Sequence, residues 1–198
     1  KIIVQETQYL YKNIIKQYLK NNLLIKNSWI YDILDGTKEN ENIIYKNNDP
    51  INGFVVLPDP KWDYYKNHLY LLVIVNNKNL YSLRELDNTS LQLLENIKSV
   101  CSNLINSGFN YKNNKIQLSK NKLRFFIHYV PSYWHLHIHI VSTDYGYKGM
   151  SINEAHNLDD IIHNIKLDSD YYKNKTMHII ESYKHCLIKE ILKATKNK

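Results

Sequence analysis

The stretch YWHLHIHI, residues 133–140, alternates histidine with aliphatic residues and decides how the chain is expected to fold. In a β-strand, side chains two positions apart lie on one face and follow one another at about 6.5–7 Å. His135, His137 and His139 would therefore form a row on one face, while the aliphatic residues between them face the core. We predict a strand over residues 135–141 that carries three aligned imidazoles.

Further segments of strand and helix length surround this strand. Apolar, β-branched runs predict strands at residues 43–45, 53–57, 69–75, 123–130 and 176–180. Amphipathic periodicity predicts helices at residues 28–34, 88–107, 152–165 and 183–192. Ser28 is expected to cap the first helix, and Gln92 to complete a capping box at the start of the second. Several strands around one long helix predict an α+β domain, an antiparallel sheet with helices on one side.

Composition bounds the size and the class of the protein. A chain of 198 residues that is 43% hydrophobic can form one medium domain, or one domain with an appendage. Residues 7–20 are amphipathic but weakly patterned, and we interpret them as an appendage or hinge. The net charge of +7 permits an anionic partner, although composition alone favours ordinary surface lysine.

Cysteine usage and hydropathy bear on the compartment. Cys101 and Cys186 lie far apart in apolar, helix-like surroundings, so we predict buried free thiols in a reducing compartment. This predicts a cytoplasmic protein, with the nucleus as a second location. No apolar stretch reaches the ~18 residues that span a bilayer, so no membrane partner is expected. The chain starts at Lys1 rather than Met, and we expect it to be a piece of a longer protein.

Three interpretations of the aligned histidines stay open on residue chemistry. They could be structural, although three in register on a polar strand face seldom are. Paired histidines on one strand can ligate zinc, but the nearby sequence offers no cysteine pair or obvious carboxylate to complete such a site. The third interpretation is nucleophilic attack on phosphorus by a neutral imidazole, with neighbouring rings that move protons. It needs neither metal nor cofactor.

Four sequence blocks carry a resemblance to a known family. They are SWIYDILD from Ser28, NDPINGFVVLPDPKW from Asn48, LYSLREL from Leu80, and HYVPSYWHLHIH from His128. Together, and in this order, they resemble the scavenger mRNA-decapping enzymes of the histidine-triad superfamily. The resemblance runs, with gaps, from about Glu6 to the predicted C-terminal helix. It implies a histidine-triad α+β domain that pairs as a homodimer.

The resemblance also implies a reaction and its catalytic residues. The family hydrolyses 7-methylguanosine-triphosphate-nucleoside, the cap remnant of mRNA decay, to 7-methyl-GMP and a nucleoside diphosphate. By motif match, His137 is the nucleophile that forms a nucleotidyl-histidine intermediate. His135 and His139 orient it and serve the leaving group. His128, Ser132 and Tyr133 match positions that line the phosphates.

Recognition of the cap base has its own physical requirement. N7-methylguanine carries a delocalised positive charge, which is attracted to an aromatic face and to carboxylates. Trp29 matches the stacking tryptophan of the family, and Glu39 and Asp59 match its acidic cap-contacting positions. Lys61 matches a position that reaches the cap nucleotide, where a cation would favour the triphosphate.

The sequence departs from the family pattern in three places, which limits how far the family's site residues can be assigned to this chain. Pro60 stands where the family usually has a leucine that packs on the base. Glu154 stands where we expect a basic residue, which puts a contact to the distal phosphate or second nucleoside in doubt. Most of the swapped N-terminal lid domain has no counterpart, so we assign residues 1–27 to its hinge or remnant and residues 28–198 to the catalytic domain.

Other functions remain alternatives. A histidine-triad hydrolase of dinucleoside polyphosphates or phosphoramidates would share the triad but would not need an aromatic and acidic pocket. A non-catalytic cap-binding module would bind capped RNA without turnover. A metal-dependent hydrolase would lose its activity to a chelator.

Overall fold

The main sheet of the protein is six-stranded, in the order β2-β3-β4-β8-β7-β9, and its neighbouring strands pair antiparallel. The computed structural model describes residues 1–146, 150, 152 and 154–196. The sheet strands are β2 (Tyr45–Asn47), β3 (Phe54–Pro58), β4 (Tyr70–Val75), β7 (Leu123–His128), β8 (His137–Ser142) and β9 (Ala155–Asn157). The predicted α+β class with an antiparallel sheet is confirmed.

The period-two pattern of the central strands separates two cores. Phe54, Val56 and Val73 belong to the main core, together with buried residues of α4 (Leu91–Ser107) and α5 (Leu158–Leu167). The alternate residues of the same strands form a second cluster with a short helix, α3 (Ser28–Leu34). This cluster contains Ile30, Ile33, Val55, Leu57, Leu72 and Ile74. The long helices thus cover one face, and α3 covers part of the other.

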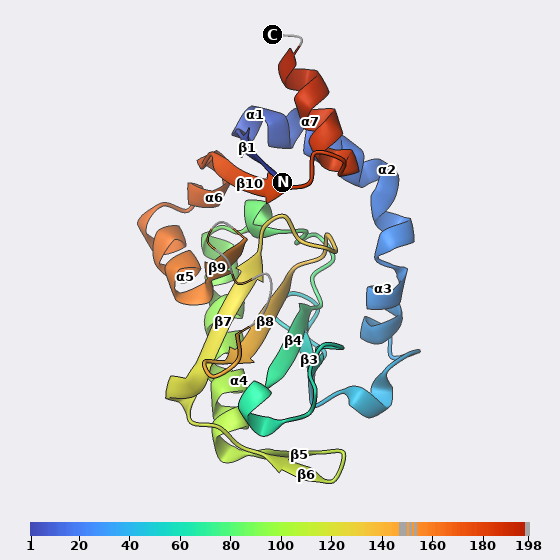
Figure 1. Ribbon diagram of the computed structural model, residues 1–198. Coiled ribbons are helices and arrows are strands. Elements are labelled where there is room, and N and C mark those ends of the chain that lie inside the picture. The colour runs from blue at the N-terminus through green and yellow to red at the C-terminus, as the bar shows by residue number, and fades with distance from the viewer. Residues whose placement is uncertain (147–149, 151, 153, 197–198) are drawn as a thin grey trace.

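The N-terminal and C-terminal segments pack against one end of the main sheet (Figure 1). Strand β1 (Ile2–Glu6) pairs antiparallel with β10 (Met177–Glu181). Helix α1 (Gln8–Leu10), a π-helical turn at Tyr11–Ile15 and helix α2 (Lys16–Lys26) follow β1. Buried residues of this segment join the main core with those of α7 (Cys186–Lys196). The domain boundary at residue 27 stays a prediction.

The remaining elements are small. Strands β5 (Phe109–Tyr111) and β6 (Asn114–Ile116) form a hairpin at the opposite end of the sheet from α1 and α7 (Figure 1). Helix α6 (Tyr171–Asn174) connects α5 to β10. Within the described residues, none of the helices combines the length and apolar character that a membrane crossing requires.

Several predicted element starts are wrong, each because local bonding displaces the start. The backbone N–H of Leu136 donates to the Leu80 carbonyl at 2.8 Å, so the β8 ladder begins at His137 rather than His135. Ala155–Asn157 pairs with β7, and the Asn157 side chain then caps α5, so this helix does not begin at Ile152. Residue 153 of that predicted helix lies outside the described residues.

Two predicted helix caps and one buried thiol are also corrected. The box before α4 is formed by Asp87 and Ser90, so its closing residue lies two positions before the predicted Gln92. Helix α3 is preceded by Asn27, and no side chain caps it. Helix α7 starts at Cys186 rather than Tyr183, and this thiol is exposed, because the preceding residues form a turn. Cys101 is buried, which raises its pKa to about 12.

Candidate active site

A pocket of about 390 Å³ opens on the sheet face that carries the histidines. The register places His139 opposite Leu72 and His137 opposite Ile74, so the two histidines share the face covered in part by α3. The pocket lies among α3, β4, β8, β10, the loop after β3 and the chain that follows β7. All but two of the predicted site residues line it: Trp29, Asp59, Pro60, Lys61, His128, Ser132, Tyr133, His137 and His139.

His135 does not line the pocket. Its side chain is fully buried, its Nε2 lies 2.7 Å from the Val75 carbonyl oxygen, and its ring meets Tyr31 edge-on. A carbonyl can only accept a hydrogen bond, so Nε2 carries the ring proton. The residue precedes β8 instead of belonging to it, which turns its side chain out of the predicted row.

The main chain of His135 nevertheless sets the chemistry of His137. The Nδ1 of His137 lies 2.7 Å from the His135 carbonyl oxygen and must donate to it. In the neutral ring, Nε2 is then left with the lone pair. Burial lowers the pKa of His137 to about 4; the hydrogen bond to the His135 carbonyl opposes this shift, and electrostatic repulsion from His128 and His135 adds to it. At neutral pH this imidazole is uncharged and suited to nucleophilic attack.

His139 is held as a second neutral ring. Its Nδ1 lies 3.0 Å from the Tyr70 hydroxyl, and its ring stacks on Phe126. Burial lowers the pKa of His139 strongly, and the neighbouring histidines lower it further. The Asp59 carboxylate, 3.9 Å from Nδ1, lies beyond hydrogen-bonding distance and does not keep the ring charged. When the Tyr70 hydroxyl donates to Nδ1, the ring proton sits on Nε2.

The second ring nitrogen of His139, Nε2, is available to bind a ligand. This nitrogen is buried and has no hydrogen-bonding partner among the described residues. The ring centroids of His128 and His137 lie 4.4 and 5.1 Å from that of His139. A buried donor without a partner is costly, and a phosphoryl oxygen in the pocket would satisfy it.

Comparison with known proteins identifies the family. A family model described as "Scavenger mRNA decapping enzyme C-term binding" matches residues 28–155, more than half of the chain. The chain belongs to this family. The family resemblance of the four sequence blocks is thereby confirmed.

Relatives of the decapping family match most of this chain. A protein named m7GpppX diphosphatase from Sus scrofa is 35% identical over 88% of this chain and 50% of its own length. Those from Ascaris suum and Caenorhabditis elegans are 35% and 31% identical over 89% and 100% of this chain, and 56% and 61% of their own lengths. The chain thus spans about half the length of the first of these relatives.

A solved structure is similar at a lower level. "Hnt3 in complex with DNA and guanosine" aligns with 85% of this chain and 94% of its own, with a TM-score of 0.41 and 13% identity. This likeness is too weak to bear on function.

The part of the pocket that matches the family's cap-binding positions combines aromatic and acidic groups. Trp29, on α3, meets Tyr133 edge-on with ring centroids 4.9 Å apart. The Asp59 carboxylate is nearly buried and accepts the backbone N–H of Lys61 at 2.9 Å. Burial raises the pKa of Asp59, while the N–H and the charge of Lys61 lower it. Pro60 lies in the pocket wall between these two residues.

Glu39, the second predicted acid, lies outside the residues that line the pocket. It is exposed, its φ is +59°, and its carboxylate accepts the Asn42 side-chain amide at 2.6 Å. Asn42 in turn accepts the Tyr111 hydroxyl of the β5–β6 hairpin at 2.6 Å. These bonds hold the Glu39 loop on the hairpin. Asp59 is therefore the family-matched acid that this structure brings to Trp29.

Sequence reasoning missed part of the pocket wall. Glu154, noted only as a departure from the family, lines the pocket and pairs with Lys1 at 2.8 Å. Tyr129, Ile180 and Glu181 also line it. The last two belong to β10, and the strand pattern of that segment gave no sign of where it would pack.

The described residues contain no group of three or more His, Cys, Asp or Glu side chains that could hold a metal ion. The pocket gathers three imidazoles, of which His137 and His139 are held neutral, together with hydroxyl groups, one lysine and three carboxylates. Such a set can bind phosphoryl oxygens, supply a nitrogen nucleophile and move protons.

Acidification should weaken the fold through His137. An unfolded histidine titrates near 6.5, and the folded pKa is about 4, so the unfolded state binds more protons between these values. The stability that the neutral ring contributes is present above about pH 6.5 and is lost as pH falls toward 4. By urea denaturation we expect roughly 1–2 kcal/mol of this loss at pH 5. The variant His137→Asn should lose that part of the pH slope, and an unchanged slope would contradict the assignment.

Proposed function

We propose that the protein hydrolyses 7-methylguanosine 5′-triphospho-5′-nucleoside caps to 7-methyl-GMP and a nucleoside diphosphate. The observation that carries the proposal is the tautomer of His137, whose Nδ1 is committed to a backbone carbonyl in a pocket that also holds His128, Ser132 and Tyr133. Membership of the decapping family supports the substrate class. The relatives' name, m7GpppX diphosphatase, supports the reaction.

The reaction proceeds in two displacements. The Nε2 lone pair of His137 attacks the phosphorus bonded to 7-methylguanosine, a P–N bond forms, and the P–O bond to the next phosphate breaks. The electron pair leaves with the nucleoside diphosphate. Water then attacks the phosphoramidate, the P–N bond breaks, and 7-methyl-GMP is released. His137 regains its lone pair, and the proton lost by water passes to solvent or to a neighbouring group.

The neighbouring groups would bind the phosphates through hydrogen bonds. Nε2 of His139 can donate to a phosphoryl oxygen when Tyr70 donates to its Nδ1. Its lowered pKa means that the His139 ring carries no additional proton at neutral pH, but a bound polyanion would raise that pKa. His128, Ser132 and Tyr133 add further donors around the same space. His135 acts through its carbonyl, which fixes the His137 ring.

The methylated base would be recognised by Trp29 and Asp59. Stacking on an indole face and proximity to a buried carboxylate both favour a cationic base over a neutral one. Pro60 can cover part of the base, and Lys61 can reach the nucleotide's phosphate. Of the two acids that match the family's cap-contacting positions, Asp59 is the one that lines the pocket, and we assign the selectivity for the cap to it.

We also propose that the active form is a homodimer, as the family resemblance implies. The main sheet ends in two three-residue strands, β2 and β9, whose outer backbone groups have no partner within that sheet. Sedimentation velocity at micromolar concentration should show a species twice the mass of the chain. A species of single-chain mass at all concentrations would contradict this proposal.

Incubation with 7-methylguanosine-triphosphate-adenosine should yield 7-methyl-GMP and ADP, with or without EDTA. His137→Asn should abolish turnover because asparagine supplies no nucleophilic nitrogen, while products are identified by mass spectrometry. His178→Asn is the matched control, since His178 is an exposed histidine on β10. Capped-nucleotide binding without cleavage would point to a binding module, and a loss in EDTA that zinc restores would point to a metal-dependent hydrolase.

Asp59→Asn should remove selectivity for the methylated base. Asparagine keeps an oxygen for the Lys61 N–H but lacks the charge that complements N7-methylguanine. We expect KM to rise about tenfold for the methylated cap and less than about twofold for its unmethylated analogue. Asp63→Asn is the control, because this exposed acid pairs with His68 instead. Equal effects on both substrates would favour a general dinucleoside polyphosphate hydrolase.

A further inference from the structure

The LYSLREL block contains a buried arginine to which the proposed reaction gives no role. Arg84 sits in the short helical turn Leu83–Glu85, and its side chain is fully buried. Ser82 and Glu85 form a capping box around this turn. The box fixes the backbone of Arg84 and therefore the direction of its side chain. A buried guanidinium is costly unless each of its donors is paired.

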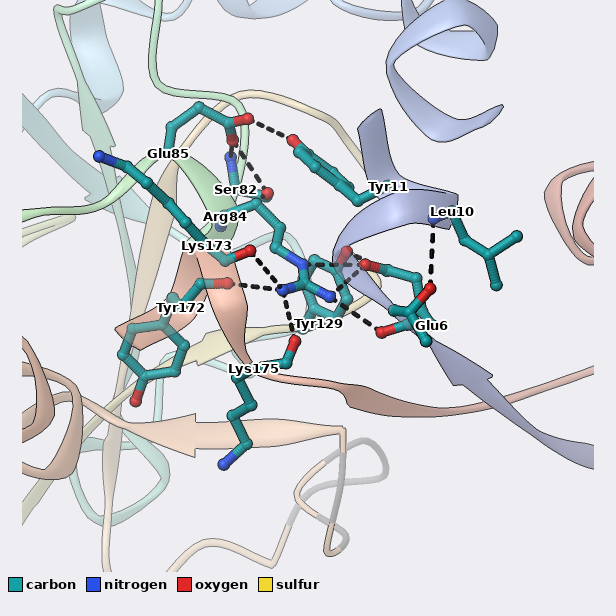
Figure 2. Close-up of polar contacts among 11 residues, drawn as sticks. Glu6, Leu10, Tyr11, Ser82, Arg84, Glu85, Tyr129, Tyr172, Lys173 and Lys175 are labelled. Atoms are coloured by element: carbon teal, nitrogen blue, oxygen red, sulfur yellow. Dashed lines mark hydrogen bonds and ion pairs between the residues drawn. The ribbon is translucent and has the colours of Figure 1, made fainter. Parts of the chain in front are cut away.

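All five donors of Arg84 have partners (Figure 2). Nε donates to the Glu6 carboxylate at 2.8 Å, and Nη2 donates to the same carboxylate oxygen and to the Glu6 carbonyl at 3.0 Å. Nη1 donates to the carbonyls of Tyr172 and Lys175, each at 2.6 Å. One side chain thus joins β1 to the segment that leads into β10.

The same carboxylate reaches the pocket wall. The second oxygen of Glu6 accepts the hydroxyl of Tyr129, which is buried and shielded from water. Tyr129 lines the pocket, directly follows His128, and donates its backbone N–H to the Glu154 carbonyl at 3.0 Å. Figure 2 shows the Tyr129 ring beside the Glu6–Arg84 pair. The buried pair therefore ends on a residue of the candidate active site.

We infer that Glu6 and Arg84 are positioning residues, which fix Tyr129 and with it the pocket wall that carries His128. The inference rests on the proposed function. A charge pair sealed from water resists displacement, because a shifted Glu6 would leave a buried guanidinium unpaired. The pair therefore couples the place of β1 to the wall that faces the reacting phosphates.

Tyr129→Phe tests this coupling, because it removes one hydroxyl and keeps the ring. We expect kcat for the capped dinucleotide to fall about tenfold, the equivalent of one lost hydrogen bond, with KM within about twofold. We expect kcat to change more than KM because the pocket wall at His128 and Tyr129 would face the phosphates rather than the base. A purely structural bond would lower stability and leave kcat per folded molecule unchanged.

Tyr11→Phe is the matched control. Both Tyr11 and Tyr129 flank the Arg84 guanidinium, with ring centroids 5.4 and 5.9 Å from its central carbon. The Tyr11 hydroxyl donates to Glu85 instead of Glu6, and Tyr11 is not among the residues that line the pocket. Tyr11→Phe should lower the unfolding temperature about as much as Tyr129→Phe while leaving kcat and KM unchanged.

A double-mutant cycle tests whether Glu6 acts through the Tyr129 hydroxyl. If Glu6 acts through this hydroxyl, Glu6→Gln combined with Tyr129→Phe should reduce kcat no further than the more damaging single change. If the Glu6→Gln variant does not fold, the comparison of Tyr129→Phe with Tyr11→Phe still tests the inference. Wild-type kcat in Tyr129→Phe, or equal losses in Tyr129→Phe and Tyr11→Phe, would overturn the inference.

The imidazole NMR signals of His128 give a readout independent of turnover. They should shift in Tyr129→Phe and not in Tyr11→Phe, even if the wild-type protein fails to cleave the cap. Absence of cleavage by the wild type would overturn the proposed function alone. Unshifted His128 signals in Tyr129→Phe would overturn the positioning role.

Discussion

The hydrogen bond from His137 Nδ1 to the carbonyl of His135 is the constraint on which the site depends. It exists because the chain enters the sheet only at His137, so the preceding peptide is free to turn its carbonyl toward the ring. That peptide is held in turn, since the His135 side chain donates to Val75 and the next N–H donates to Leu80. A residue whose side chain stays out of the pocket thus decides which nitrogen of His137 carries the lone pair.

Burial, rather than net charge, shapes the electrostatics of this pocket. Among its described lining residues, Lys61 is the sole lysine or arginine, and Asp59, Glu154 and Glu181 contribute carboxylates. The excess of positive charge on the chain therefore lies elsewhere. A triphosphate in such a pocket would depend on neutral donors, the imidazoles and hydroxyls, whose hydrogen bonds strengthen where water is excluded. The same exclusion keeps the His137 and His139 rings uncharged, the state that the proposed attack on phosphorus by His137 would require.

The sequence predicted those features that arise from local periodicity. Apolar, β-branched runs located the central strands β3 and β4, alternation placed His137 and His139 on one face of β8, and the apolar stripe located α4. Local pattern failed at His135, where a bend of the backbone interrupts an alternation that continues in the sequence, and it gave no sign that Asn42 would hold the Glu39 carboxylate outside the pocket lining. The part of the pocket wall that β10 contributes could not be predicted from the sequence, for another reason. Its place depends on pairing with β1, more than 170 residues away, and no local pattern encodes such a partner.

The buried Glu6–Arg84 pair illustrates what non-local bonds add to a fold that apolar packing already holds together. Replacing a buried ion pair with apolar residues of similar volume often costs no stability, so stability alone does not explain the charges. Apolar contacts tolerate small slips, because dispersion is non-directional and each contact is weak. A guanidinium with five directed bonds tolerates far less, and it fixes β1, the approach to β10 and Tyr129 in one arrangement. Directed bonds are therefore found where the pocket wall needs a defined position, and apolar contacts fill the rest of the core.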